Sequence, residues 1–445
     1  MNNWKEYKFS ELCDISRGAS PRPIHEYITD GEGMPWVKIA DATKSNSRFI
    51  EYTAERIKLS GVKKSVEVFK GDLILSNSAT PGLPKFMAIN ACIHDGWMLL
   101  RNFKNITKEF AYWLLLNERN NLVKQGTGTV FINLKTDILR NHIVKIPSIE
   151  EQNKIVSILN GIEDKIQLNT QINQTLEQIA QALFKSWFVD FDPVCAKVQA
   201  LSDGLSLEQA ELAAMQAISG KTLEELTALS QTQPEHYAEL AETAKAFPCE
   251  MVEVDGVEVP KGWEVTPLSG LFTLISGTQI PKEEHIYEAK EGYERFIQNR
   301  DYSSNNHITY VEISKKNKRC TEKDILIDRY GDAGKIRFGI SGVYNIALAK
   351  IALNDNNLIE YLRWFLMQPK QKAYFEQASG ASTRASLNTS TFKGINVVIP
   401  SNFILNIFSK ISNTYLDSLR NLKEENNTLM KTRDSLLPKL LNGDI

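Results

Sequence analysis

The most constraining feature of this 445-residue chain is a central stretch with the apolar spacing of a coiled coil. Between residues 149 and 190, steps of three and four residues give a mostly apolar seam with one early glycine and no proline. The seam consists of Leu159, Ile162, Ile166, Asn169, Asn173, Leu176, Ala180, Leu183 and Trp187. About 40 residues of helix would span roughly 60 Å. Because such a seam is costly to expose, we expect the helix to need a partner.

A second stretch, residues 402–441, carries a matching seam. It consists of Tyr415, Leu419, Leu422, Asn426, Leu429, Arg433, Leu436 and Leu440. We expect the two helices to pair antiparallel within one chain. The seam residues Asn169, Asn173 and Asn426 would cost stability but fix the register, unless the register is shifted and they lie on the surface.

Each long helix follows a segment in which the same features recur in the same order. Trp4 precedes Gly18 by 14 residues, as Trp263 precedes Gly277. Later features pair as follows: strands at 70–75 and 323–327, polar loops at 76–82 and 328–334, helices at 109–113 and 360–364, polar loops at 125–129 and 379–384, and Ile-Pro-Ser at 146–148 and 399–401. Six features in order at one spacing indicate an internal duplication.

The sequence therefore predicts an α/β (α+β) fold with an internal pseudo-two-fold repeat. The expected parts are globular modules at 1–148 (module 1) and 260–401 (module 2), long helices at 149–191 and 402–445 forming an antiparallel coiled coil, and an acidic helical insertion at 192–259. Residues 205–246 read as two or three short helices. The insertion ends in an expected hairpin around Asp255-Gly256, a pair that favours a type I′ turn.

Charge is distributed unevenly along the chain, although the net charge is only −2. Residues 1–147 carry +6 and residues 260–400 carry +4, whereas residues 190–259 carry −11. The basic modules permit polyanion binding without demonstrating it. No apolar run approaches the roughly 20 residues of a membrane span. The five cysteines are scattered, which favours reduced thiols in a cytoplasm.

Sequence motifs for catalysis are missing. Gly220-Lys221-Thr222 resembles the end of a phosphate-binding loop, but Met215 stands where the leading glycine belongs. There is no dinucleotide fingerprint, no Asn-Pro-Pro-aromatic tetrad of amino-methyltransferases, and no His pair with zinc spacing. We therefore predict no catalytic and no metal-binding residues, with a cryptic active site as the alternative.

Three segments carry a resemblance to a known family: residues 151–156 (Glu-Gln-Asn-Lys-Ile-Val), 183–191 (Leu-Phe-Lys-Ser-Trp-Phe-Val-Asp-Phe) and the final 436–445. Together with the duplication, they resemble the specificity subunits of type I restriction–modification systems. The resemblance implies two target-recognition domains that each read one half of a split, asymmetric DNA site. It implies a non-catalytic chain without its own cofactor. Two modification subunits would bind S-adenosylmethionine, and restriction subunits, attached through them, would use ATP and Mg.

Polar side chains in the loops of both modules are the expected base and phosphate contacts, because they can hydrogen-bond base edges or hold phosphates. The candidates are Asn77, Ser78, Thr80, Lys85, Thr127 and Thr129 in module 1, and Gln279, Lys282, Arg300, Arg329, Tyr330, Lys335, Thr383 and Arg384 in module 2. Loop capping or solvent exposure is the alternative for each. Trp4, Trp113, Trp263 and Trp364 are expected in the cores. Two other classes remain open: an autonomous DNA-modifying enzyme and a coiled-coil scaffold without sequence preference.

Overall fold

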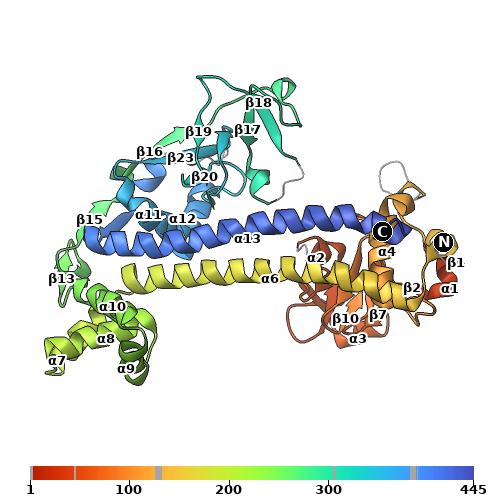
Figure 1. Cartoon of the computed structure of the whole chain (residues 1–445), viewed down its shortest axis with the longest axis horizontal. Coiled ribbons are helices and arrows are strands. Elements are labelled where there is room, and N and C mark those ends of the chain that lie inside the picture. The colour runs from red at the N-terminus through yellow and green to blue at the C-terminus, as the bar shows by residue number, and fades with distance from the viewer. Residues whose placement is uncertain (1–3, 45–46, 126–132, 304–306, 381–386, 388) are drawn as a thin grey trace. The chain divides into compact units, whose positions relative to one another are not determined.

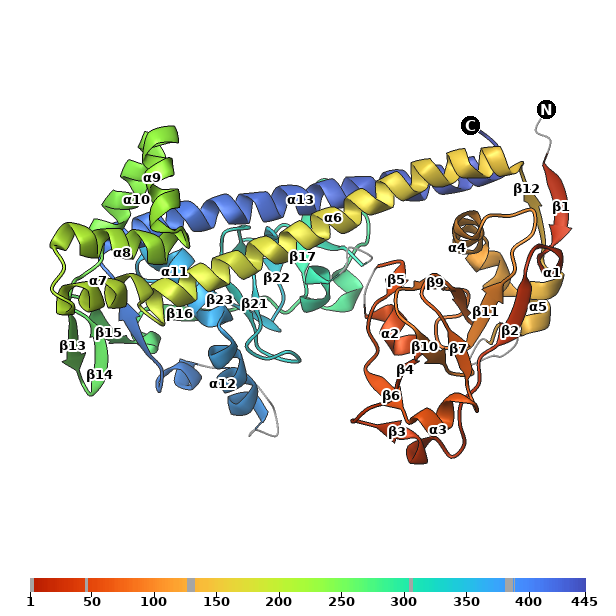
Figure 2. The ribbon, with the colours of Figure 1, turned by 90° about the horizontal axis from the view of Figure 1, so that it is seen from below.

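The computed structural model describes residues 4–44, 47–125, 133–303, 307–380, 387 and 389–445. The chain forms two compact units, one from Met1–Gln171 with Lys423–Ile445 and the other from Ile172–Leu422. Module 1 belongs to the first unit and module 2 to the second. Figure 1 and Figure 2 show the order of the elements.

Module 1 contains two five-stranded sheets and a two-stranded ribbon. The first sheet has the order β3 (Ile28–Thr29), β6 (Glu55–Ile57), β4 (Met34–Val37), β10 (Ala91–Ile93) and β7 (Val66–Val68). The second has the order β2 (Asp14–Arg17), β11 (Trp97–Arg101), β8 (Leu73–Ser76), β9 (Pro84–Met87) and β5 (Phe49–Ile50). The ribbon joins β1 (Lys5–Lys8) to β12 (Ile143–Ile146). The helices are α1 (Phe9–Leu12), α2 (Ile39–Thr43), α3 (Leu59–Val62), α4 (Lys108–Lys124) and α5 (Thr136–Asn141).

Module 2 repeats this topology with shorter sheets. Its first sheet has the order β18 (Thr309–Glu312), β17 (Tyr293–Ile297), β22 (Gly342–Tyr344) and β19 (Arg319–Cys320). Its second sheet has the order β16 (Phe272–Ser276), β23 (Leu348–Leu353), β20 (Leu326–Asp328) and β21 (Ile336–Arg337). Its ribbon joins β15 (Glu264–Pro267) to β24 (Asn396–Ile399), and its helices are α11 (Ile359–Met367) and α12 (Pro369–Gly380). The parallel pair β4–β10 recurs as β17–β22, so the predicted duplication is confirmed at the level of strand order. Module 1 adds the edge strands β3 and β5.

Gly18 and Gly277 occupy the same close approach in the two modules. Each follows the first strand of a sheet and donates its N–H across the sheet, Gly18 to Trp97 O at 2.8 Å and Gly277 to Leu348 O at 3.1 Å. A Cβ on Gly18 would lie 2.2 Å from the carbonyl oxygen of His94, and one on Gly277 would lie 2.0 Å from that of Asn345. Backbone packing therefore excludes a side chain at both positions.

Gly277→Ala should lower the free energy of unfolding by about 1–3 kcal/mol or more, because the backbone must move to admit the methyl group. Gly161→Ala is the matched control, since that glycine lies in a helix with nothing within 4 Å of an added Cβ. The control should gain about 0.5–1 kcal/mol from helix propensity. Thermal unfolding of the two variants measures the difference, and equal melting temperatures would contradict this packing.

The four repeated tryptophans belong to the cores, as predicted. Trp113 and Trp364 are 1% and 0% exposed, Trp263 is 5% exposed, and Trp4 packs partly buried at the edge of the module 1 core. The indole N–H of Trp113 donates to Asn160 Oδ1 at 2.9 Å, and that of Trp364 donates to Ser412 Oγ at 2.6 Å. Asn160 and Ser412 lie on the two long helices, so each module is joined to its following helix by an equivalent bond.

The two long helices, α6 (Ile149–Phe188) and α13 (Asn402–Asn442), pair antiparallel in each unit. In the first unit, Glu163 binds Arg433 at 2.6 Å and Asn169 Nδ2 donates to Asn426 Oδ1 at 3.0 Å. In the second unit, the rings of Phe184 and Phe188 pack on Phe408. The predicted seams are confirmed, because their residues are buried or half-buried.

Asn169 and Asn426 form a buried polar pair within this seam. They are 0% and 8% exposed, and Asn426 Nδ2 also donates to Ile166 O at 3.2 Å. Neither side chain lies on the surface, so the predicted register is correct. A polar pair at a seam position favours one alignment of the helices over shifted ones.

Asn169→Leu alone should cost about 1–3 kcal/mol in unfolding free energy, because the buried Oδ1 of Asn426 loses its hydrogen-bond donor. Combining it with Asn426→Leu should recover most of that loss, since an apolar pair suits the seam. Chemical denaturation of the two single variants and the double variant forms a double-mutant cycle. Additive losses would show that the two amides do not depend on each other.

Four helices and a hairpin make up the acidic insertion: α7 (Asp192–Ser202), α8 (Leu207–Ser219), α9 (Leu223–Thr232), α10 (Pro234–Ala246), β13 (Met251–Val254) and β14 (Val257–Pro260). Residues 205–246 form three short helices, α8 to α10, where the sequence predicts two or three. Asp255 and Gly256 both have positive φ, 53° and 75°, as a type I′ turn requires. The buried ammonium of Lys197 donates to Ala244 O at 2.8 Å and Phe247 O at 2.7 Å, which ties α7 to the end of α10.

Candidate nucleic-acid interface

Three loops meet in module 1 at the end of its two sheets: residues 17–22, 76–82 and 94–96. Ala19 N donates to Ile93 O at 3.3 Å, and Asn77 N donates to Gly96 O at 2.8 Å. The hydroxyl of Ser20 donates to Asp95 Oδ1 at 2.7 Å. We call these three segments the loop cluster of module 1.

Module 2 has an equivalent loop cluster, formed by residues 276–281, 328–334 and 345–347. Thr278 N donates to Tyr344 O at 2.9 Å, and Arg329 N donates to Ala347 O at 2.8 Å. Arg329 thus occupies the position of Asn77, because both donate their N–H to the turn between the same two strands.

The middle loop of each cluster is closed by the same backbone bond. Gly82 N donates to Ser76 O at 2.8 Å, and Gly334 N donates to Asp328 O at 2.8 Å. Both glycines have positive φ, 75° and 92°, which favours glycine. The same main-chain bond therefore closes the middle loop of both clusters, whereas the side chains on that loop differ between the modules.

In module 1, two predicted contacts turn out to support the loops from inside. Asn77 is 3% exposed and donates Nδ2 to Asp95 O at 3.0 Å. Lys85 is 5% exposed and donates to Ser47 O, and burial lowers the pKa of its ammonium to about 8. Ser78 and Thr80 are partly exposed on the 76–82 loop. Thr127 and Thr129 lie outside the described residues, but Leu134, just after them, donates its N–H to Asn77 O at 2.8 Å.

In module 2, most of the predicted contacts reach solvent. Arg329 is partly exposed, donates Nη1 to Ser276 Oγ at 2.8 Å and lies 5.5 Å from the ring centroid of Tyr330, which is 41% exposed. The other exposed candidates are Gln279, Lys282, Arg300 and Lys335. Thr383 and Arg384 lie outside the described residues. Arg329 and Tyr330 thus place a guanidinium beside an aromatic face at the loop surface, a pair suited to guanine.

A buried ion pair supports the 328–334 loop and was not foreseen from the sequence. Arg337 binds Asp328 at 2.8 Å, and their side chains are 10% and 1% exposed. Burial raises the pKa of Asp328, while hydrogen bonding and the charge of Arg337 act in the opposite direction. Arg337 lies on β21, the counterpart of the strand that carries Lys85. The sequence feature that could have revealed this ion pair is a cationic residue, Lys85 or Arg337, at the same strand position in both modules.

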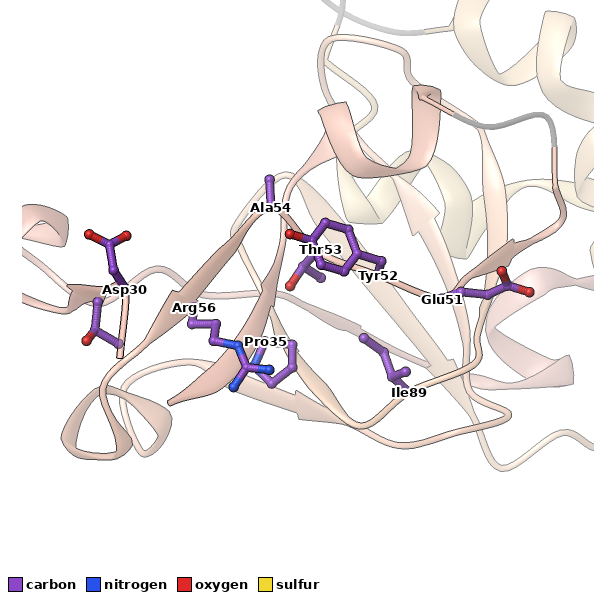
Figure 3. A pocket seen from close by; sticks show the side chains of 9 residues that line it. Asp30, Pro35, Glu51, Tyr52, Thr53, Ala54, Arg56 and Ile89 are labelled. Carbon is purple, nitrogen blue, oxygen red and sulfur yellow. The ribbon is translucent and has the colours of Figure 1, made fainter. Parts of the chain in front are cut away.

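Module 1 also has a surface pocket of about 350 Å³ beside β3, β4 and β6. Its lining includes Asp30, Glu51, Tyr52 and Arg56, which Figure 3 shows around the opening. Two carboxylates and one guanidinium make it a poor site for a polyanion. Among the described residues no group of three or more His, Cys, Asp or Glu could hold a metal ion. No described helix is both long and apolar enough to cross a membrane.

Comparison with known proteins decides the family. The family model described as type I restriction modification DNA specificity domain matches residues 1–178 and 260–428. The chain belongs to this family. The specificity subunit of the type I restriction enzyme HindI from Haemophilus influenzae is 40% identical over 100% of both chains. That of MjaIX from Methanocaldococcus jannaschii is 24% identical over 100% of this chain and 94% of its own.

A solved structure confirms the fold of this specificity family. The S subunit of the type I restriction-modification system from M. genitalium matches with a TM-score of 0.53 at 16% identity, over 99% of this chain and 96% of that one. The predicted fold class and the predicted family are thus confirmed. The two matches to the specificity model leave residues 179–259, and with them the acidic insertion, outside the duplicated domain. Family membership makes this chain a DNA-recognition subunit rather than a catalytic one.

Arg329→Ala should weaken binding to the chain's own DNA site by about 1–3 kcal/mol and relax one base position, if the guanidinium reads a guanine. Arg329→Lys should restore charge but not the two-pronged geometry, so the relaxed position should persist. Mapping the methylated sequence of host DNA for each variant checks this. Uniform weakening without a change of sequence would assign Arg329 to a phosphate instead.

Proposed function

We propose that this chain reads a bipartite, asymmetric DNA site, with one recognition domain for each half-site. The observation that carries the proposal is that both modules have a loop cluster with the same backbone bonds but with different side chains. The same backbone bonds hold both loop clusters, yet Asn77 faces inward where Arg329 faces the surface. Two sites of equal geometry and different chemistry suit two different half-sequences.

The proposed contacts are the candidates that are exposed or partly exposed, within or near the loop cluster of each module, together with those outside the described residues. They are Ser78, Thr80, Thr127 and Thr129 in module 1, and Gln279, Lys282, Arg300, Arg329, Tyr330, Lys335, Thr383 and Arg384 in module 2. We propose a supporting role within the loops for Asn77 and Lys85. The proposed boundaries of the parts are 1–148, 149–191, 192–259, 260–401 and 402–445.

The proposed partners follow from the repeat. A chain with two equivalent halves offers two equivalent surfaces, which suits two copies of a modification subunit. Those subunits would bring S-adenosylmethionine, and restriction subunits would join through them with ATP and Mg. We place this assembly in the cytoplasm, where chromosomal DNA is accessible and the five scattered cysteines stay reduced.

Exchanging residues 1–148 for the matching domain of a relative tests the proposal. The methylated sequence should change in one half only, because module 1 has its own sheets and its own loop cluster. Methylome mapping of the host with the native and the exchanged gene provides the readout. The native gene is the control, and a change in both halves would refute independent reading. Methyl transfer by the purified chain alone would instead favour an autonomous enzyme, and binding without sequence preference would favour a scaffold.

We also propose that the helix pair sets the spacing between the half-sites. Inserting seven residues, one heptad, into both α6 and α13 keeps the seam and adds about 10 Å, close to three base pairs. The two half-sequences should stay unchanged while the unspecified spacer lengthens. Single insertions into only one helix serve as controls and should abolish pairing. Retained activity with the original spacer would show that the helices do not set the distance.

A further inference from the structure

A short lysine-rich turn occurs at the same place in both modules. In module 1 it links β6 to β7 and reads Lys-Leu-Ser-Gly-Val-Lys-Lys-Ser over residues 58–65. In module 2 it links β18 to β19 and reads Ile-Ser-Lys-Lys-Asn-Lys over residues 313–318. The strands on either side are counterparts in the sheet orders, so the turns are counterparts too. We call residues 58–65 and 313–318 the basic turns.

The lysines of both basic turns lie on the surface, where Lys64 Nζ also donates to Tyr27 Oη at 2.5 Å and lies over its ring. All six are exposed: Lys58, Lys63, Lys64, Lys315, Lys316 and Lys318. Within the described part of the chain, no carboxylate lies at ion-pair distance from any of them. Lys58 Nζ instead donates to the main-chain oxygen of Glu26 at 2.8 Å. In module 2 the nearby carboxylate of Glu294 is taken by Arg319 at 2.6 Å.

Each basic turn is fastened to the loop cluster of its module. In module 1, Ser65 Oγ donates to Ala19 O at 2.7 Å and lies 3.2 Å from Ile93 O. In module 2, Lys318 N donates to Thr278 Oγ1 at 2.8 Å, and Lys318 O accepts from Tyr344 N at 3.2 Å. The turn and the loops are therefore adjacent parts of one surface in each module.

We propose that the basic turns bind the sugar–phosphate backbone of duplex DNA beside each half-site. This assignment rests on the proposed DNA-reading function of the loop clusters. Lysine is a flexible point charge that attracts phosphate without reading the base, so the turns set affinity and register rather than sequence. The basic turns recur at one position in both modules, whereas the side chains of the loops differ. This pattern fits a contact with the sugar–phosphate backbone, which is the same in every DNA sequence.

The test uses the full chain in its complex with the modification subunits, on a duplex carrying the methylated host sequence and on a scrambled duplex. Two triple variants remove the charge: Lys58→Ala with Lys63→Ala and Lys64→Ala, and Lys315→Ala with Lys316→Ala and Lys318→Ala. A third, Lys5→Ala with Lys8→Ala and Lys145→Ala, changes three exposed lysines of the β1–β12 ribbon, which lies at the other end of module 1 from α3 (Figure 2). Binding is measured from 50 to 300 mM salt.

Each basic-turn variant should lower the slope of log K against log [salt] by roughly 2 to 3, because each phosphate that a lysine neutralises accounts for about 0.9 of that slope. Affinity for both duplexes should fall by the same factor, and the methylated sequence should not change. Replacing the same lysines by arginine should restore the slope, and the ribbon variant should keep the original one. Equal melting temperatures identify folded variants.

An unchanged slope in folded variants overturns the proposal, and so does loss of only the sequence-specific binding, which would make the turns base readers. An equal loss of slope in the ribbon variant would also overturn it, because the effect would then be general. Failure of the underlying function gives a different result, in which the unaltered complex binds the methylated and the scrambled duplex equally well.

Discussion

In each half, a hydrogen bond from a buried indole joins a recognition domain to a long helix. The buried indole of Trp113 reaches Asn160, and that of Trp364 reaches Ser412. An indole carries a large apolar surface and a single polar atom, so its N–H must find a partner when the ring is buried. Because the acceptors, Asn160 and Ser412, lie on the long helices, the indole can be buried with its N–H satisfied only when the domain is correctly oriented on its helix.

The neighbourhood of each indole bond is built differently. In the first unit, Asn160 also accepts from Arg48 Nη1 at 2.7 Å, and Arg48 binds Asp164 on the same helix. In the second unit, Ser412 donates to Glu360, which is paired with the buried Arg363. A buried pair of this kind adds little net stability but penalises any arrangement that leaves one charge alone. The duplication thus retained the anchor and replaced its surroundings.

Much of the architecture could be predicted from periodicity and local backbone chemistry. The heptad seams and the Asp255-Gly256 turn are set by rules that act within a few residues. The paired glycines 18 and 277 are found from the repeat of the sequence, although the carbonyl groups that crowd them, those of His94 and Asn345, lie far along the chain. The direction of a polar side chain in a loop is decided by partners far away in sequence. Asn77 turns inward because Asp95 offers a carbonyl, and Lys85 because Ser47 does. The pairing of Asp328 with Arg337 likewise depends on a hairpin whose register no local pattern specifies.

In the 76–82 and 328–334 loops, the atoms that hold the shape of the loop are different from the side chains available to contact a ligand. Backbone bonds, one glycine and buried side chains beneath the loop hold its shape, so partly exposed positions such as 78 and 329 carry little of the folding free energy. Substitutions there can accumulate at nearly constant stability, whereas the same number of changes beneath the loop would unfold the domain. The side chains that differ between the two modules thus lie where a substitution disturbs the fold least, and a new binding preference can arise without an intermediate that fails to fold.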